Sequence, residues 1–170
     1  FSDTKFCANE VSVFSANNGT VNAIGGGMYF SVSATVTDLT LKFDRCDFSD
    51  NSVASSHGSA GGGFAFYPQA NLTDSKVEFL SSNFLENNVT ADFFASGGGV
   101  ILSVGSWPLH KFLGSNFATL FDGCVFRSNR LRGAKCSGGG VNFDMIADRA
   151  GFTSSFRSTV FKANSLAPKS

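Results

Sequence analysis

The chain has 170 residues, of which 42% are hydrophobic, enough for one domain with a substantial apolar core. Thirteen Lys and Arg balance thirteen Asp and Glu, so the overall charge does not point to nucleic acid as a partner. The sequence has no apolar run of about 18 residues, which excludes a membrane-spanning helix from this segment.

A nine-residue pattern, Phe-x-x-(Cys/Ser/Thr)-x-Phe-x-x-Asn, occurs five times along the chain. The copies begin at Phe1, Phe43, Phe79, Phe121 and Phe156 and end at Asn9, Asn51, Asn87, Asn129 and Asn164. A Gly-Gly-Gly triplet precedes each of the last four copies, at 25–27, 61–63, 97–99 and 138–140. The resulting period of about 35 to 42 residues is typical of solenoids and propellers.

Apolar residues alternate with other residues after each triplet, as in Met28 and Phe30 or Phe64 and Phe66. Alternation of aromatic and β-branched side chains predicts strands, and no 3.6-residue stripe supports a helical repeat. The single Trp lies outside the pattern, which disfavours propeller blades. The predicted fold is therefore all-β: a right-handed, single-stranded parallel β-helix of about four to five coils, in the pectin-lyase-like class.

In such a stack, equivalent residues of successive coils lie above one another, about 4.8 Å apart. We expect ring stacking along two Phe columns and an amide hydrogen-bond ladder along an Asn column. The glycines are expected where the backbone needs a positive φ or a close approach. The predicted columns are Phe43, Phe79, Phe121 and Phe156; Phe48, Phe84, Phe126 and Phe161; and Asn51, Asn87, Asn129 and Asn164.

The combination of Phe-x-x-Asn with Gly-Gly-Gly-apolar-x-apolar resembles the FxxN and GGA(I/L/V) repeats of chlamydial polymorphic outer membrane proteins. The likeness covers nearly the whole chain, although the third triplet position is Gly where that family prefers Ala. The same pattern is equally similar to the repeats of right-handed β-helix proteins of bacteria and protists. The resemblance implies a secreted or surface-displayed protein, often an adhesin. We expect residues 1–170 to be a single β-helix segment of a longer array, with neighbouring coils of the same protein as partners.

In chain order, four stretches are expected to be loops. Residues 10–24 read as an insertion, and residues 52–60 as a small polar loop. Residues 103–119 contain a six-residue excess with Trp107 beside Pro108, a candidate for a protruding contact with a sugar or a protein; the alternative is that Trp107 folds back over the coil. The stretch after Asn129 groups cations that could bind sulfated or phosphorylated glycans, with a simply solvated loop as the alternative: Arg127, Arg130, Arg132 and Lys135.

Catalytic carboxylates are weighed and disfavoured. Asp44 and Asp122 share a column two coils apart, about 9.6 Å, a separation near that of an inverting glycosidase pair. Leu80 fills the coil between them, and Asp144 with Asp148 has no supporting spacing. His57 and His110 lie in predicted loops with no fixed partner for nucleophilic catalysis.

Cys46 and Cys124 are two coils apart, too far for a disulfide, so free buried thiols are expected there. The redox state of Cys7, Cys46, Cys124 and Cys136 is otherwise left open. No Cys or His spacing matches a metal site, and no cofactor motif is recognised. Three N-glycosylation sequons, at Asn18, Asn71 and Asn88, fall in predicted loops.

The sequence thus favours a non-enzymatic structural or adhesive β-helix module of a secreted or cell-surface repeat protein. Its expected partners are neighbouring coils and glycans or another cell-surface protein, without nucleic acid. The alternative is a polysaccharide lyase or glycoside hydrolase of the pectin-lyase-like class. A carboxylate cluster beside a cation on one exposed strand face would favour the enzyme, and an apolar or Ser/Thr face would favour the module.

Overall fold

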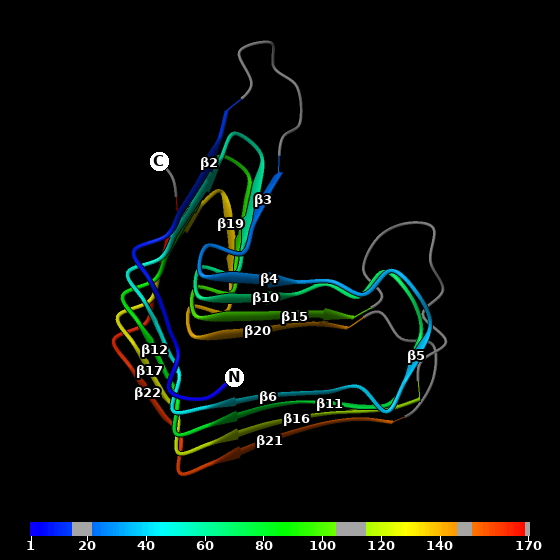
Figure 1. The fold of residues 1–170 in the computed structure, drawn as a ribbon. Coiled ribbons are helices and arrows are strands. Elements are labelled where there is room, and N and C mark those ends of the chain that lie inside the picture. Colours follow the sequence, from blue (N-terminus) through cyan, green and yellow to red (C-terminus); the bar gives the residue numbers. More distant parts are fainter. Residues whose placement is uncertain (15–21, 105–114, 146–150, 169–170) are drawn as a thin grey trace.

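The computed structural model describes residues 1–14, 22–104, 115–145 and 151–168. Within these residues the chain forms β-strands and no helix, and neighbouring strands of each sheet run parallel. The all-β fold with parallel strands is therefore confirmed. Figure 1 shows successive passes of the chain lying side by side, so that each sheet collects strands from distant parts of the sequence.

The strands form five sheets, numbered here in chain order. The first contains β1 (Lys5–Cys7), β7 (Asp47–Ser49), β12 (Asn83–Leu85), β17 (Val125–Arg127) and β22 (Val160–Lys162). The second contains β2 (Glu10–Val13), β8 (Ser52–Ser55), β13 (Asn88–Ala91), β18 (Arg130–Gly133) and β23 (Ser165–Pro168). The third contains β3 (Asn22–Ile24), β9 (Gly58–Ala60), β14 (Phe94–Ser96) and β19 (Lys135–Ser137).

The two remaining sheets carry the longer strands. The fourth contains β4 (Met28–Phe30), β10 (Phe64–Phe66), β15 (Val100–Val104) and β20 (Val141–Met145). The fifth contains β5 (Val36–Thr37), β6 (Thr40–Asp44), β11 (Leu72–Leu80), β16 (Ser115–Asp122) and β21 (Phe152–Arg157), with both β5 and β6 pairing with β11.

Apolar side chains gather in two cores because strand alternation sends every second residue inward. The main core lies between the first, fourth and fifth sheets and is dominated by phenylalanine. A smaller core lies between the second and third sheets, where Val89, Leu131 and Ala95 pack together. Figure 1 shows these two parts of each pass as two arms that meet at an angle.

Both predicted Phe columns are confirmed as ring stacks in the main core. The ring of Phe79 lies 4.8 Å from Phe43 and 5.1 Å from Phe121, and both ring pairs are close to coplanar. The ring of Phe84 lies 4.8 Å from that of Phe48 and 4.6 Å from that of Phe126. The outer members, Phe156 and Phe161, continue the two stacks.

The predicted Asn column is confirmed as an amide ladder. Asn51 Nδ2 donates to Asn87 Oδ1 at 3.0 Å, and Asn87 Nδ2 donates to Asn129 Oδ1 at 2.9 Å. Asn129 Nδ2 in turn donates to Asn164 Oδ1 at 2.9 Å. The same amides also donate to backbone carbonyls of the preceding strand, as Asn87 Nδ2 does to Phe48 O at 2.8 Å. The ladder therefore satisfies buried polar groups at the bend between the first and second sheets.

Two bends flank each strand of the first sheet, and each bend places one residue in the left-handed region, a non-glycine residue everywhere except Gly123 before β17. Before the strand lie Arg45 and Ser81, with φ of 51° and 47°; after it lie Asp50 and Glu86, with φ of 56° and 57°. L residues adopt this conformation at a cost of about 1–2 kcal/mol. The stacked Phe and Asn side chains on either side hold the backbone in these bends.

The first glycine of each triplet also has a positive φ, between 61° and 74°. The second and third glycines serve a different need, because the triplets of successive passes hydrogen-bond directly to one another. A Cβ added at Gly63 would lie 2.6 Å from Gly99 O and 3.2 Å from Asn87 Nδ2. Close approach, rather than backbone freedom, therefore requires glycine at that position.

Replacing Gly63 with alanine is expected to lower the free energy of unfolding by about 2–3 kcal/mol, because the backbone oxygen that it would meet cannot rotate away. Gly123→Ser is the matched control. Gly123 has a φ of 64°, and a Cβ added there would make only ordinary contacts, the nearest with Ser81 Oγ at 3.5 Å; serines 81 and 158 adopt the equivalent bend. Urea unfolding of both variants measures the difference, and equal losses would contradict the close-approach explanation.

Three stretches predicted to be loops form strands instead, which corrects the sequence interpretation. Residues 10–24 contribute β2 and β3, residues 52–60 contribute β8 and β9, and the stretch after Asn129 contributes β18 and β19. These segments are short and rich in small or polar residues, so their own sequence has little strand character. They are strands because each pairs with its equivalent in the neighbouring pass.

Candidate binding surfaces

The third and fourth sheets meet at an inward corner, and a hollow of about 1200 Å³ lies along it. We call this hollow the corner groove. Its floor is apolar, because Ile24, Ala60 and Tyr67 line it and pack in one cluster with the buried Ala65 and Ile101. These side chains face outward because their strand neighbours fill the two cores on the other side of each sheet.

Tyrosine rings form one wall of the corner groove. Tyr29, in β4, is about half exposed, and its ring lies 6.2 Å from that of Tyr67 in the next pass. Burial raises the pKa of the Tyr67 hydroxyl above its ordinary value, and the Asp144 carboxylate adds to the effect. Tyr67 therefore remains a neutral hydrogen-bonding group throughout the physiological pH range.

The opposite wall carries an aromatic cluster on the third sheet. The His57 ring stacks on Phe93 at 5.5 Å and meets Phe94 edge to face at 6.0 Å. Lys135 Nζ lies 5.2 Å and 5.4 Å from the centroids of the two Phe rings. Such contacts attract a cation to a ring face, so Lys135 holds its ammonium beside an exposed aromatic surface.

The remaining lining is polar and close to neutral. Asn22, Ser96 and Asn142 line the corner groove, and Ser103 Oγ donates to Asp144 Oδ2 at 3.3 Å. Among the described residues of the lining, Asp144 and Lys135 carry the formal charges. Apolar rings with hydroxyl, amide and carboxylate groups beside them suit a ligand that has both hydroxyls and apolar C–H faces.

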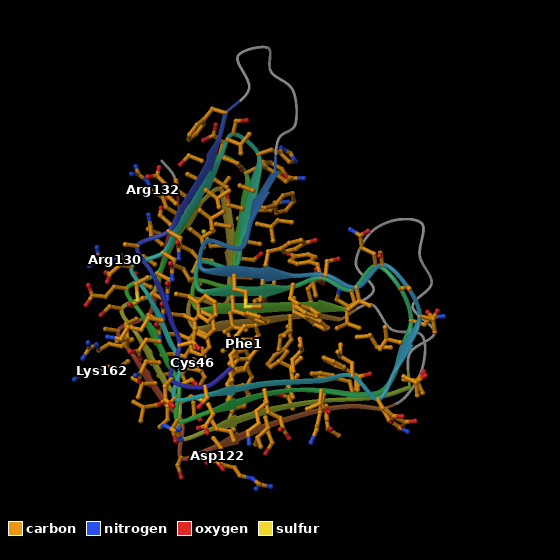
Figure 2. The ribbon with its side chains drawn as sticks, viewed as in Figure 1. Phe1, Cys46, Asp122, Arg130, Arg132 and Lys162 are labelled. Carbon is orange, nitrogen blue, oxygen red and sulfur yellow. The ribbon has the colours of Figure 1, made fainter. Side chains whose placement is uncertain are left out.

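Of the cations predicted as a binding cluster, the structure keeps three together and separates the fourth. Arg127 ends β17, and Arg130 and Arg132 lie on the exposed side of β18. Lys135 lies in β19 on the third sheet, where it lines the corner groove. Lys162, which sequence reasoning missed, pairs in register with Arg127. Figure 2 shows the labelled Arg130, Arg132 and Lys162 side chains pointing away from the molecule on the same side.

The predicted contact at Trp107 lies outside the described residues, as do His110, Asp148 and the Asn18 sequon. The six-residue excess is placed between Leu102 and Ser115, since the equivalent segment from Phe66 to Thr73 is six residues shorter.

The other two predicted glycosylation sequons lie at or beside strands. Asn71 directly precedes β11. Asn88 is the exposed first residue of β13, not a loop residue as predicted.

Asp44 and Asp122 lie on either side of Leu80 in the fifth sheet, in the register that the sequence predicts. Asp44 pairs with Arg45 Nη1 at 3.0 Å. Neither Asp is among the residues that line the corner groove, and Figure 2 shows Asp122 at the outer margin of the fold. This separation places the carboxylate pair and the aromatic surface in different parts of the molecule.

All four cysteines are free thiols. Cys46 and Cys124 are both buried, and Ser82 occupies the equivalent position in the pass between them. The Ser82 hydroxyl accepts a hydrogen bond from the backbone N–H of Cys46 at 3.0 Å. Burial raises the pKa of the Cys124 thiol to about 11, so this group stays protonated at neutral pH. Among the described residues, no three His, Cys, Asp or Glu side chains are grouped so as to hold a metal ion.

Compared with known proteins, the chain matches no protein-family model, no curated protein and no solved structure. Within the described residues, no helix is long and apolar enough to cross a membrane.

Proposed function

We propose that the five sheets wind as a right-handed, single-stranded parallel β-helix of the pectin-lyase-like class. The support is the constant order in which each pass enters the five sheets, returning to the same position after 35, 36 or 42 residues. Stacked Phe and Asn columns are the interactions expected between successive coils of such a solenoid.

Our functional proposal is a non-enzymatic structural and adhesive module of a secreted or cell-surface protein that binds glycans or another surface protein. The corner groove is the observation that carries it: an apolar floor between exposed rings, with neutral hydrogen-bonding groups alongside. The resemblance to chlamydial polymorphic outer membrane protein repeats supports a surface location. Among the occupants of such a groove, a linear neutral glycan fits best, because sugar C–H faces stack on rings while hydroxyls bond to amides and carboxylates.

Neighbouring coils of the same longer protein are the other proposed partners. At the last pass, Phe156, Phe161 and Leu166 are about half exposed, although their equivalents in the inner passes are buried. β21, β22 and β23 are the edge strands of their sheets among the described residues, so no further strand pairs with their outer backbone edges there. Another coil with the same pattern would cover these rings and edges.

A polysaccharide lyase or glycoside hydrolase is the alternative. Asp144 and Lys135 in the corner groove favour it, because a carboxylate and a cation are the usual groups of such chemistry. The rest of the described lining is apolar, aromatic, amide or hydroxyl apart from His57, which is the kind of face expected of a binding module. The non-enzymatic function is therefore the one proposed.

The test is a panel of neutral and uronic-acid polysaccharides, scored both for binding and for product release. We expect Tyr29→Ala to weaken binding of the best neutral glycan about five- to thirtyfold, equivalent to about 1–2 kcal/mol, because the ring supplies a stacking face. The fold should tolerate this change, since Ala65 occupies the register position beside Tyr29.

Phe156→Ala is the matched control, because Phe156 and Tyr29 are each 44% exposed but Phe156 lies away from the groove. Calorimetric or fluorescence titration measures the binding. Equal weakening by both variants would remove the groove from the proposal, and shortened polysaccharide chains would establish the enzymatic alternative.

A further inference from the structure

The outer face of the first and second sheets changes its charge from one end of the stack to the other. On its first three passes, Glu10 and Asp47 lie on strands, and Asp50 and Glu86 lie at the bends after β7 and β12. The cations there are Lys5, on β1, and Arg45, at the bend before β7, which pairs with Asp3. Its last two passes carry only cations among the described residues of β17, β18, β22 and β23. We call Arg127, Arg130, Arg132 and Lys162 the basic strip.

Strand alternation makes the basic strip a fixed feature of the surface. In β18, Leu131 and Gly133 are buried against the second core, so Arg130 and Arg132 point outward. These two residues are separated by roughly 6.6 Å along the strand. Arg127 lies around the bend at Asn129, and Lys162 lies beside Arg127 in the next pass, roughly 4.8 Å away in backbone spacing. Four cations therefore occupy one compact patch.

No carboxylate of the described residues lies within 4.0 Å of a charged nitrogen of the basic strip. Other cations of the chain do have such partners: Arg45 pairs with Asp3 at 2.8 Å, and Lys76 pairs with Glu78 at 3.0 Å. The register neighbours of the arginines are uncharged or basic: Leu85 and Lys162 beside Arg127, Asn88 and Ser165 beside Arg130, and Thr90 and Ala167 beside Arg132. Like charges this close repel one another, and an anionic ligand would relieve that repulsion.

We propose that the basic strip binds a sulfated polysaccharide chain, at a site separate from the corner groove. Guanidinium groups pair with two oxygens of a sulfate at once, and three of the four cations are arginines. The strip extends along one pass and around its bend, a span that several sulfates of one linear chain would cover. The flanking register positions have no aromatic ring on which a nucleic-acid base would stack, so a glycan fits better than single-stranded DNA.

The test uses heparin as the sulfated probe, with desulfated heparin and single-stranded DNA of equal charge as comparison ligands. The triple variant Arg127→Ser, Arg130→Ser and Arg132→Thr replaces each arginine with a residue found at the same register position in another pass, namely Ser49, Ser52 and Thr90. We expect it to weaken heparin binding at least about tenfold. The slope of log Kd against log salt concentration should fall by about two, because fewer counterions are displaced.

The control variant removes three cations elsewhere, so that the net charge changes equally. It combines Lys5→Asn, Lys42→Ser and Lys76→Thr, again with residues that occur in register at Asn83, Ser155 and Thr40. We expect less than a twofold loss. Unchanged heparin affinity in the arginine variant, or equal loss in both variants, would overturn the proposal. So would equal binding of desulfated heparin, or tighter binding of DNA.

This site is independent of the proposed neutral-glycan groove, and the two fail separately. Tyr29→Ala should leave heparin binding unchanged, whereas the arginine variant should leave neutral-glycan binding unchanged. Circular dichroism of each variant checks that the strands are retained.

Discussion

Replacing Phe84 with alanine is expected to lower the free energy of unfolding by about 3–5 kcal/mol. The Phe84 ring is fully buried and stacked on both sides, at 4.8 Å from Phe48 and 4.6 Å from Phe126. It also meets Phe79 edge to face at 5.2 Å. Alanine would leave a cavity bounded by stacked rings, and these rings cannot close it without breaking their contacts with the passes beyond.

The control for this prediction is Phe161→Ala, in the same column. Phe161 is 48% exposed and stacks on one side only, at 4.8 Å from Phe126. We expect it to cost about 1–2 kcal/mol, because less apolar surface leaves water and no enclosed cavity forms. Urea unfolding followed by circular dichroism compares the two variants. Similar losses would show that the stack does not act as a continuous core.

The sequence predicted the repeating interior well because that interior repeats the same residues. A column such as Phe43, Phe79 and Phe121 is visible from spacing alone, and parallel strands place equal positions beside each other. The Asn ladder followed for the same reason. The strands of the second and third sheets were missed because segments such as Gly58–Ala60 have no strand preference of their own. The bends at Arg45 and Glu86 were missed too, because neither residue type marks a positive φ.

The candidate surfaces were less predictable, since they depend on how the sheets are oriented. The sequence grouped Lys135 with the arginines because they are close in the chain, yet β18 and β19 belong to different sheets. Lys162 lies 35 residues beyond Arg127 but beside it in space, and the aligned nine-residue pattern could have shown this. Tyr29, Tyr67 and Phe94 come together at the corner between two sheets, and no spacing in the sequence encodes that angle.

Asn87→Ala is expected to be as damaging as the loss of a buried ring, at about 3–5 kcal/mol, although it removes little apolar surface. Asn87 is fully buried, and its Oδ1 accepts from the backbone N–H of Asn51 at 3.2 Å and from Asn51 Nδ2 at 3.0 Å. Its own Nδ2 donates to Phe48 O and Asn129 Oδ1. Alanine would leave the Asn51 N–H and the Phe48 carbonyl without these partners inside the protein, and water cannot replace them there.

Asn9→Ala provides the comparison, because Asn9 is the exposed first member of the ladder and its side chain donates one bond, to Asn51 Oδ1 at 3.0 Å. The backbone N–H of Asn9 donates to the same oxygen and is retained in the variant. We expect a loss below about 1 kcal/mol, since water can reach this end of the ladder. Urea unfolding and amide hydrogen exchange at Asn51 measure both effects. If Asn87→Ala unfolds no more easily than Asn9→Ala, the rings alone hold the passes together, and the amide ladder only follows a bend set by the backbone.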